Sequence, residues 1–325
     1  MKAVVSRPGS SSLSVREVET PQMGPHDVMI EVAAAGVTVA DILLRKGLYP
    51  IGESETAIPG LEVAGVVRRI GREVTSWRPG DPICSIVSGG GYAELAIVPA
   101  EHCLPVPSHW SMTDAASAVG PICTAWFNVA MLGRLAVGES LLVHGGSGGV
   151  GSWAVQIFGA RGHPIYATAG GAARCERIEA LGATRCFDHQ VGAFDKALFA
   201  TTENQGVDVV LDILGAQALE ANLRVLKEGG RLVGIATQQG AKASVDLWTL
   251  YRRRLSLTGS ALRAQTRRTK KEIVAAVLAN VWPVILQRRI ASVVDSVYPF
   301  DQAVEAQDRL ERGGNFGKVV LQIKE

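Results

Sequence analysis

The chain reads HGGSGGVGS from His144 to Ser152, and this stretch decides the fold. A short apolar run precedes it, and it opens into Trp153–Phe158, whose apolar residues have helical spacing. Gly146, Gly148 and Gly151 form a G-x-G-x-x-G pattern in this strand–turn–helix setting. Glycines allow a tight turn and a close pyrophosphate, and the helix N-terminus offers unpaired N–H groups to phosphate. The stretch therefore predicts a dinucleotide site, the alternative being a purely structural turn.

Strands and helices alternate around the glycine stretch. Apolar strands of this kind suit a parallel sheet buried on both faces. The alternation predicts a doubly wound Rossmann unit. The expected elements are strand Leu141–His144, helix Gly151–Gly159, strand Pro164–Ala169, helix Ala172–Leu181, strand Val207–Ile213, helix Ala216–Leu226 and strand Arg231–Ile235.

The first hundred residues instead carry short β signals broken by Pro and Gly, and only Val39–Lys46 has a helical pattern. They predict a compact, largely antiparallel β domain. A long helix at about Arg267–Leu286 and a last strand, Lys318–Ile323, are expected to return the chain to that domain. The Rossmann sheet is then an insertion, with expected domains at 1–118, 119–262 and 263–325. The expected β strands are Lys2–Ser6, Asp27–Ala34, Glu62–Ile70, Pro82–Val87 and Tyr92–Val98.

Bulk composition excludes several function classes. The 325 residues are 47% hydrophobic and 20% charged, with a formal net charge of +2, which gives no general attraction to nucleic acid. Basic clusters at 252–254 and 267–271 are interpreted as solvated surface in preference to nucleic-acid contacts. We find no apolar run near the roughly 18 residues of a membrane span and no signal peptide, and so expect no membrane partner. Five scattered cysteines indicate reduced, mostly buried thiols and a cytoplasmic protein.

The end of the second expected strand bears on which dinucleotide binds. An acidic side chain there would hold the ribose 2′-hydroxyl of NAD, but the chain reads Thr168-Ala169-Gly170-Gly171. Arg174 opens the next helix, where a guanidinium could pair with a 2′-phosphate. These residues favour NADPH over NADH. The alternative is that Arg174 is a surface cation paired with Glu176 or Glu179.

Many segments, in order along nearly the whole chain, resemble the zinc-free quinone oxidoreductases (the zeta-crystallin group) of the medium-chain dehydrogenase/reductase superfamily, in particular its branch of NADPH-dependent quinone reductases. The resemblance implies an α/β fold in which a GroES-like β-rich catalytic domain carries the inserted Rossmann sheet, with the active site between them. It also implies a homodimer formed through the sheet edge near Leu255–Gly259. The matching segments are 40–41, 45–50, 60–65, 89–94, 124–126, 146–151, 167–170, 206–212, 257–263 and 316–321.

The ligand pattern of zinc-dependent relatives is missing from this chain. Thr38 stands near the first cysteine position, Leu61 replaces the histidine of a Gly-His-Glu segment, and Cys84 and Cys103 stand alone. Zinc requires thiolate or imidazole ligands, so we expect no metal. Without a Lewis acid, the chemistry that fits is hydride transfer from NADPH to an already electrophilic quinone or enone. The proton would come from solvent or through a relayed hydroxyl.

Site residues follow from the resemblance, position by position. Tyr49, Thr38 and Thr124 are expected at the reacting centre, although a packed loop tyrosine is the alternative for Tyr49. Thr38 stands where the family commonly has asparagine, and residues 120–123 also depart from the family pattern, which affects substrate preference. Asp41 is expected to cap or orient its short helix. The expected cofactor-binding residues are Gly146, Ser147, Gly148, Gly149, Val150, Gly151, Gly170, Gly171, Arg174, His189, Leu214, Gly234, Ala236, Phe316 and Lys318.

Two cofactor positions have alternatives: His189, a tyrosine in relatives, could be a surface turn residue, and Lys318 could be a strand-edge lysine without a ligand. Two rival functions also remain. One is a non-catalytic NADPH-binding protein. The other is a serine hydrolase, since Gly145, Ser147 and Gly149 also fit G-x-S-x-G. The required order of serine, acid and histidine fails because no histidine follows His189.

Overall fold

The computed structural model describes residues 1–6, 13–48 and 56–324, and the chain divides into two compact units. Residues Met1–Pro121 and Gln265–Glu325 form the first, which we call the β-rich unit, and Ile122–Ala264 form the second, the Rossmann unit. The chain leaves the β-rich unit and returns to it, as expected for an inserted domain. The divisions fall at 121/122 and 264/265, where the sequence analysis placed them at 118/119 and 262/263.

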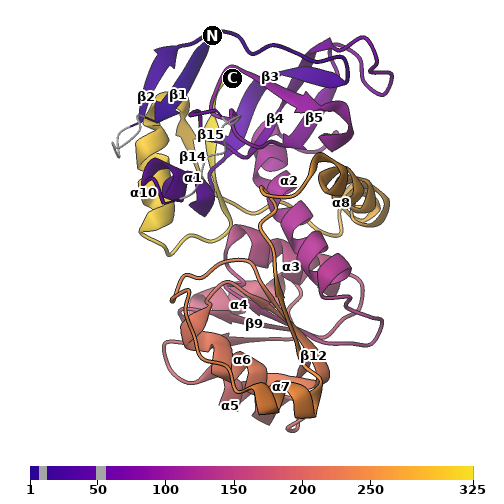
Figure 1. The fold of residues 1–325 in the computed structure, drawn as a ribbon, viewed down its shortest axis with the longest axis vertical. Coiled ribbons are helices and arrows are strands. Elements are labelled where there is room, and N and C mark those ends of the chain that lie inside the picture. Colours follow the sequence, from indigo (N-terminus) through magenta and orange to yellow (C-terminus); the bar gives the residue numbers. More distant parts are fainter. Residues whose placement is uncertain (7–12, 49–55, 325) are drawn as a thin grey trace. The chain divides into compact units, whose positions relative to one another are not determined.

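A mostly antiparallel sheet organises the β-rich unit (Figure 1). Strand β6 (Leu95–Pro99) also pairs with β3, and β1 (Lys2–Ser6) pairs with β2 (Leu13–Glu17) in a separate hairpin. Alternating apolar side chains such as Val28, Ile30 and Val63 point into one core. The sheet order is β14 (Val294–Pro299), β15 (Lys318–Gln322), β3 (Asp27–Gly36), β4 (Glu62–Ile70), β5 (Pro82–Ile86) and β7 (Cys103–Pro105).

Helices of this unit include α1 (Val39–Arg45) and α10 (Ala303–Glu311). The expected single helix over Arg267–Leu286 is wrong, because the structure has α8 (Arg267–Asn280) followed by α9 (Trp282–Leu286). Pro283 lies in the first turn of α9. Proline has no N–H to donate to the preceding turn, so one helix could not run through it unbroken.

The longest helical stretch crosses the division between the units. Helix α2 (Met112–Ala125) continues into a π-helical segment, Trp126–Leu132. These 21 residues reach a mean hydropathy of 1.4, long and apolar enough to cross a membrane by length and composition, so the expectation that no such run exists is wrong. The most apolar window is 72% buried inside the protein, as in the core helix of a soluble protein.

The Rossmann unit holds a six-stranded parallel sheet in the order β10-β9-β8-β11-β12-β13, the 3-2-1-4-5-6 order of dinucleotide-binding folds. Figure 1 shows α3 and α4 on one side of this sheet and α6 and α7 on the other. The predicted fold class is confirmed. The strands are β10 (Arg185–Asp188), β9 (Ile165–Ala169), β8 (Leu141–His144), β11 (Val207–Asp212), β12 (Leu226–Gly234) and β13 (Ser256–Gly259). The helices are α3 (Gly149–Gly159), α4 (Ala172–Ala180), α5 (Phe194–Thr201), α6 (Leu219–Val225) and α7 (Leu247–Arg253).

Several boundaries in this unit differ from the expectation: α3 begins at Gly149 and not at Gly151, and the strand expected over Arg231–Ile235 runs from Leu226 to Gly234. Residues Ala216–Ala218 form a 3-10 turn before α6, and Leu226 begins β12 instead of ending the helix. Leu226 pairs with Val207 of β11 and is buried in the core with Val210 and Leu232. Pairing with a strand distant in the sequence therefore overrides the local helical pattern.

Candidate functional site

The glycine stretch forms the turn between β8 and α3. Gly145 has a φ of +68°, a conformation that favours glycine, and the N–H of Gly146 donates to the Thr168 carbonyl at 3.0 Å. Helix α3 then begins at Gly149, with Gly148 as its N-cap. The stretch therefore follows the carboxyl end of the central strand β8, where this fold binds dinucleotides.

The three glycines of the G-x-G-x-x-G pattern differ in how tightly the surrounding structure packs against them. A Cβ atom at Gly151 would lie 2.1 Å from the Gly145 carbonyl oxygen, so only glycine lets α3 pack so closely on the turn. A Cβ at Gly146 would lie 3.0 Å from the Ala167 Cβ. A Cβ at Gly148 would meet only the Gly145 oxygen, at an ordinary 3.4 Å. The fold itself does not require glycine at 148, and the space beside it suits a pyrophosphate.

The N-terminus of α3 adds donors to that space. No side chain caps it, whereas Thr38 caps α1 and Thr266 caps α8. The first N–H groups of a helix have no partner within the helix, and their dipole favours an anion. The space beside Gly148 and the helix N–H groups that begin at Gly149 and Val150 therefore fit a pyrophosphate by shape and charge.

His144 directly precedes the glycine turn and connects it to neighbouring elements by hydrogen bonds, a role that the sequence analysis missed. Its Nδ1 lies 2.9 Å from the Thr168 hydroxyl at the end of β9, and its Nε2 lies 2.6 Å from Oδ1 of Asn222 on α6. The ring also packs edge-on against Phe194. Burial lowers the pKa of His144, so its ring is neutral. The neutral ring connects β9, α5 and α6 beside the glycine turn. Its position directly before the glycines was the signal for this role.

The residues expected around the adenosine ribose come together at the ends of β9 and β10. Arg174 donates from Nη1 to the Gly170 carbonyl, which holds its guanidinium over the end of β9. A Cβ at Gly170 would meet ring atoms of His189 at 3.3 Å, so His189 faces the same turn. Gly171 has a φ of +95° and is the N-cap of α4, with no side-chain cap.

A carboxylate also lies here. Asp188 ends β10, and its Oδ1 accepts from the N–H groups of Gly171 and Gln190, each at 2.9 Å. These backbone bonds hold the pKa of Asp188 below its usual range. The sequence analysis searched for an acid only after β9. Because β10 is parallel to β9, its carboxyl end reaches the same edge of the sheet.

Leu214, Gly234 and Ala236 lie near the carboxyl ends of β11 and β12. Asp212 shapes this region, because its two carboxylate oxygens accept from the N–H groups of Leu214 at 2.9 Å and Gly215 at 3.0 Å. The 213–214 segment in turn accepts from Gln238 and Gln239. The two segments beyond the strands are therefore held side by side.

Thr124 lies in the last turn of α2, in the part assigned to the Rossmann unit. Its carbonyl accepts from the Asn128 side chain at 2.8 Å, and Asn128 also accepts from the Ser260 hydroxyl at 2.8 Å. Thr124 is thus tied to the segment that follows β13.

Thr38, expected at the reacting centre, forms a capping box on α1. Its hydroxyl donates to Oδ2 of Asp41 at 2.7 Å and accepts from the Asp41 N–H at 3.2 Å. Asp41 is buried and also accepts from Gly60 N–H at 2.8 Å and from the Tyr92 hydroxyl at 3.3 Å. Burial raises the pKa of the Asp41 carboxyl. Tyr49 lies outside the described residues.

Lys318 is not a solvent-exposed strand-edge lysine: it is buried at the start of β15 and forms an ion pair with Glu62. Glu62 also accepts from the Gly120 N–H at 2.9 Å, and a Cβ at Gly36 or Gly120 would collide with its carboxylate. Burial raises the pKa of Glu62, and the charge of Lys318 opposes this. Phe316 is buried nearby in the chain, its N–H bonded to Asp295.

No group of three or more His, Cys, Asp or Glu residues in the described part of the chain could hold a metal ion. At the expected ligand positions, the Thr38 hydroxyl is engaged with Asp41, and Leu61 offers no donor. Hydroxyl and aliphatic side chains are poor replacements for thiolate and imidazole.

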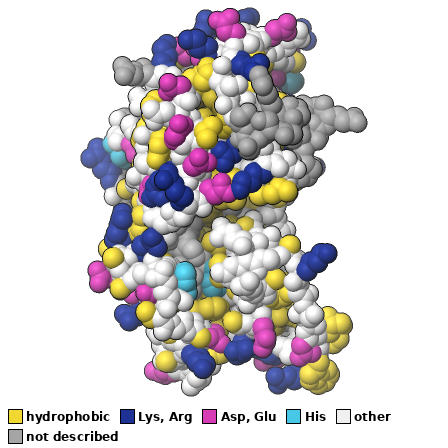
Figure 2. All heavy atoms as spheres, turned by 90° about the vertical axis from the view of Figure 1, so that its left-hand side faces the viewer, with side chains coloured by type: hydrophobic (Ala, Val, Ile, Leu, Met, Phe, Trp, Pro, Cys, Tyr) yellow, Lys and Arg dark blue, Asp and Glu magenta, His cyan; other side chains and the backbone are white. Residues whose placement is uncertain are grey.

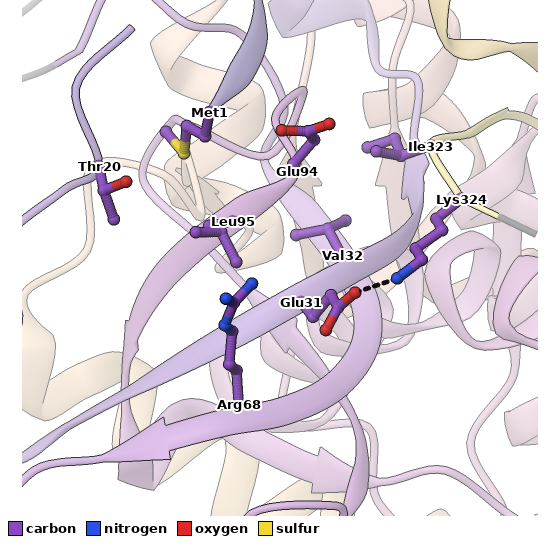
Figure 3. A pocket seen from close by; sticks show the side chains of 9 residues that line it. All are labelled: Met1, Thr20, Glu31, Val32, Arg68, Glu94, Leu95, Ile323 and Lys324. Atoms are coloured by element: carbon purple, nitrogen blue, oxygen red, sulfur yellow. Dashed lines mark hydrogen bonds and ion pairs between the residues drawn. The ribbon is translucent and has the colours of Figure 1, made fainter.

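A pocket of about 450 Å³ lies elsewhere, on the β-rich unit (Figure 3). Glu31 and Lys324 form an ion pair on its wall, with Arg68, Glu94 and the apolar Val32 around them. None of the expected site residues that the structure describes lines it. Its charges are mixed in sign, so the pocket indicates no particular class of ligand.

Comparisons with known proteins agree with this geometry. The alcohol dehydrogenase GroES-like domain model matches residues 24–108, and the zinc-binding dehydrogenase model matches residues 181–321. The quinone oxidoreductase of Lama guanicoe is 30% identical over 316 residues, which cover 95% of this chain and 92% of that protein.

Two further similar proteins match this chain over very different shares of their own length. A phenolphthiocerol synthesis polyketide synthase of Mycobacterium bovis is 37% identical over 220 residues, 67% of this chain but 10% of that protein. A mycobacterial protein solved in complex with NADPH superimposes with a TM-score of 0.89 at 29% identity, covering 99% of this chain and all of that one. The fold, the glycine turn and these matches identify an oxidoreductase that uses a nicotinamide dinucleotide on a small-molecule substrate. The chain belongs to the medium-chain dehydrogenase/reductase superfamily, in its zeta-crystallin-like group of quinone oxidoreductases.

Proposed function

We propose that the protein reduces a quinone, or a similarly activated enone, with NADPH and without zinc. The observation that carries this proposal is the geometry of the β8–α3 turn. Gly148 has no tight neighbour there, and the N-terminus of the helix that follows has no side-chain cap. The quinone acceptor is supported by the likeness to the Lama guanicoe quinone oxidoreductase.

Residues of the glycine turn would hold the pyrophosphate through backbone N–H groups, and Ser147 lies between them. Gly170, Gly171, Arg174 and His189 would surround the adenosine ribose. Leu214, Gly234, Ala236, Phe316, Lys318 and Thr124 would contact the nicotinamide half.

The preference for NADPH rests on Arg174, whose guanidinium lies at the end of β9 and can pair with a 2′-phosphate through two hydrogen bonds. Asp188 opposes this preference, since a carboxylate repels phosphate. Its Oδ1 is engaged by two backbone N–H groups, which partly neutralise its charge. On this balance we favour NADPH.

When bound, the reduced nicotinamide supplies a hydride to the acceptor. The chain's own part is to place the two reactants and exclude water. The Thr38 hydroxyl donates its proton to Asp41, so that proton is not available to a substrate oxygen. Solvent is therefore the simplest proton source, and Tyr49 is proposed to orient the acceptor carbonyl.

A homodimer through β13 is part of the proposal. This strand is one edge of the parallel sheet, and all four of its residues are exposed. Leu257 on β13 and Leu247, Trp248 and Tyr251 on α7 are large exposed hydrophobic residues. Figure 2 shows hydrophobic side chains exposed at the lower right of the view. Five buried free thiols suit the reducing cytoplasm, which we propose as the location.

The test is steady-state oxidation of NADPH, followed by its near-ultraviolet absorbance, with a series of quinones and enones. We expect turnover with at least one acceptor, unchanged after treatment with a zinc chelator. Tight NADPH binding without turnover on any acceptor would favour the non-catalytic alternative. Loss of activity on chelation, restored by zinc, would contradict the zinc-free mechanism.

A further inference from the structure

Two cysteines outside the proposed dinucleotide site lie in direct contact. Cys175 is on α4 and Cys186 on β10, and their Sγ atoms are 2.7 Å apart, with the Cys186 thiol donating to the Cys175 sulfur. A disulfide bond is about 2.05 Å long, so less than one ångström separates the two sulfurs from bonding distance. Both thiols are free, and they are 7% and 5% exposed.

The surrounding structure holds the two elements in register. Glu179 of α4 accepts from the Cys186 N–H at 2.9 Å, and Asp188 of β10 accepts from the N–H of Gly171, the N-cap of α4. These two contacts flank the sulfur pair on either side. The helix and the strand that carry the two sulfurs are therefore held together by hydrogen bonds.

A small oxidant can reach the pair. Cys175 and Cys186 both line a pocket of about 500 Å³ on the surface of the Rossmann unit, together with Glu176, Phe187 and Phe194. Hydrogen peroxide is close to water in size, so it can enter a pocket of this volume. Both cysteines are largely buried, and this pocket is the route by which an oxidant would reach them.

We propose that Cys175 and Cys186 form an oxidation site for hydroperoxides, whose product is a reversible disulfide between α4 and β10. Cys175 gives its proton to water and its thiolate attacks the peroxide; the O–O bond breaks, and the departing oxygen takes up a proton, leaving a sulfenic acid. The Cys186 thiolate then attacks the Cys175 sulfur, the S–O bond breaks, and hydroxide leaves as water. Two thiols are oxidised, and one hydroperoxide is reduced to an alcohol, or to water, plus water.

The hydrogen bond between the thiols sets the order of attack. Because Cys186 donates to Cys175, the Cys175 thiolate is the one stabilised by its neighbour, and Cys186 is the resolving thiol. Burial raises the pKa of both thiols, so the reduced pair is protonated at neutral pH and reacts slowly. The site therefore responds to sustained oxidant, and thiol reductants reverse it.

The test uses the full-length protein incubated with hydrogen peroxide, alkylated under denaturing conditions and digested with trypsin. Cleavage after Arg174, Arg177 and Arg185 places the cysteines in separate peptides, 175–177 and 186–196. We expect a disulfide-linked pair of these peptides that dithiothreitol splits, with loss of two of the five alkylatable thiols. Cys175→Ala and Cys186→Ala should each abolish the linked pair, whereas Cys103→Ala, a matched buried cysteine of the β-rich unit, should leave it unchanged.

A trivalent arsenical, which binds two neighbouring thiols at once, provides a second measurement on the reduced wild-type protein. We expect it to protect Cys175 and Cys186 together from alkylation. Recovery of both residues as free thiols after peroxide treatment, or oxidation of each to a separate sulfinic acid, would overturn the proposal. So would a disulfide from either residue to another cysteine.

Discussion

Gly151 and Gly145 approach so closely that a Cβ atom on residue 151 would lie 2.1 Å from the Gly145 carbonyl oxygen. The contact belongs to the folded chain and does not depend on any ligand. Gly148, three residues earlier, has no such contact, since a Cβ there meets its nearest neighbour at 3.4 Å. Two glycines of one motif thus differ: packing requires Gly151, and Gly148 is proposed to leave room for the cofactor.

Alanine substitutions should separate these purposes. Gly151→Ala forces the helix away from the turn and should lower the free energy of unfolding by roughly 1–3 kcal/mol. Gly148→Ala, at φ −77° and ψ 173°, should keep wild-type stability but weaken NADPH binding at least about tenfold, about 1.4 kcal/mol, by filling the phosphate space. Urea denaturation and fluorescence titration measure the two effects. Gly192→Ala, where nothing lies within 4 Å, is the neutral control; equal NADPH affinity in Gly148→Ala would place the pyrophosphate elsewhere.

Arg174→Ala should weaken NADPH while sparing NADH. A charge-assisted pair with the 2′-phosphate is worth about 1.5–3 kcal/mol, so the Kd for NADPH should rise roughly 10- to 150-fold. Arg177→Ala, an exposed arginine on the same helix, is the control and should change neither affinity. Equal losses for both cofactors would show that Arg174 does not recognise the phosphate.

Stability should depend on the protonation of His144. Its pKa in the folded protein lies below the ordinary 6.5 because the ring is buried, so below about pH 6.5 the unfolded chain binds a proton that the folded chain does not. The contribution of His144 is thus fully present above pH 6.5 and is lost as pH falls toward the folded pKa. The limiting slope is about 1.4 kcal/mol per pH unit. Urea denaturation at several pH values should show this slope in the wild type and a shallower one in His144→Gln; parallel curves would contradict the prediction.

The buried Glu62–Lys318 pair makes a prediction about the β-rich unit. Lys318→Met leaves Glu62 buried without its partner and should cost about 3–5 kcal/mol of unfolding free energy. Adding Glu62→Gln should restore most of that loss, because no uncompensated charge remains. A double-mutant cycle by chemical denaturation measures this coupling. NADPH titration of the stable double variant then tests the proposed cofactor role of Lys318 without a folding defect.

The proposed dimer can be tested at the β13 edge. Leu257→Glu places a charge on an exposed edge strand and should convert the dimer to a monomer in sedimentation equilibrium, because a charge at a buried interface is strongly disfavoured. Val191→Glu, at an exposed residue just after β10 on the opposite edge of the sheet, should leave the mass unchanged. A wild-type protein that is already monomeric, or a Leu257→Glu dimer, would remove β13 as the interface.

Much of the fold could be predicted from local patterns. Three patterns predicted it: the glycine stretch, the alternation of strands and helices around it, and the β signals before residue 100. Each of these patterns depends on residues that are close together in the chain. Predictions were wrong where a local pattern competed with a distant partner or contained a breaker: Leu226 joins β12 because it pairs with β11, and Pro283 divides the expected long helix. The apolar Met112–Leu132 helix was missed because its polar residues are scattered through it.

The sequence by itself determined the architecture and the place of the glycine turn, because the backbone requirements at Gly145 and Gly151 depend on residues close together in the chain. Only the tertiary structure decided which polar groups meet: His144 with Asn222, Asp188 with Gly171, Lys318 with Glu62, and Cys175 with Cys186. The members of these pairs come from different helices, strands and turns. Their distances depend on how whole strands and helices pack, and no short-range pattern records that packing.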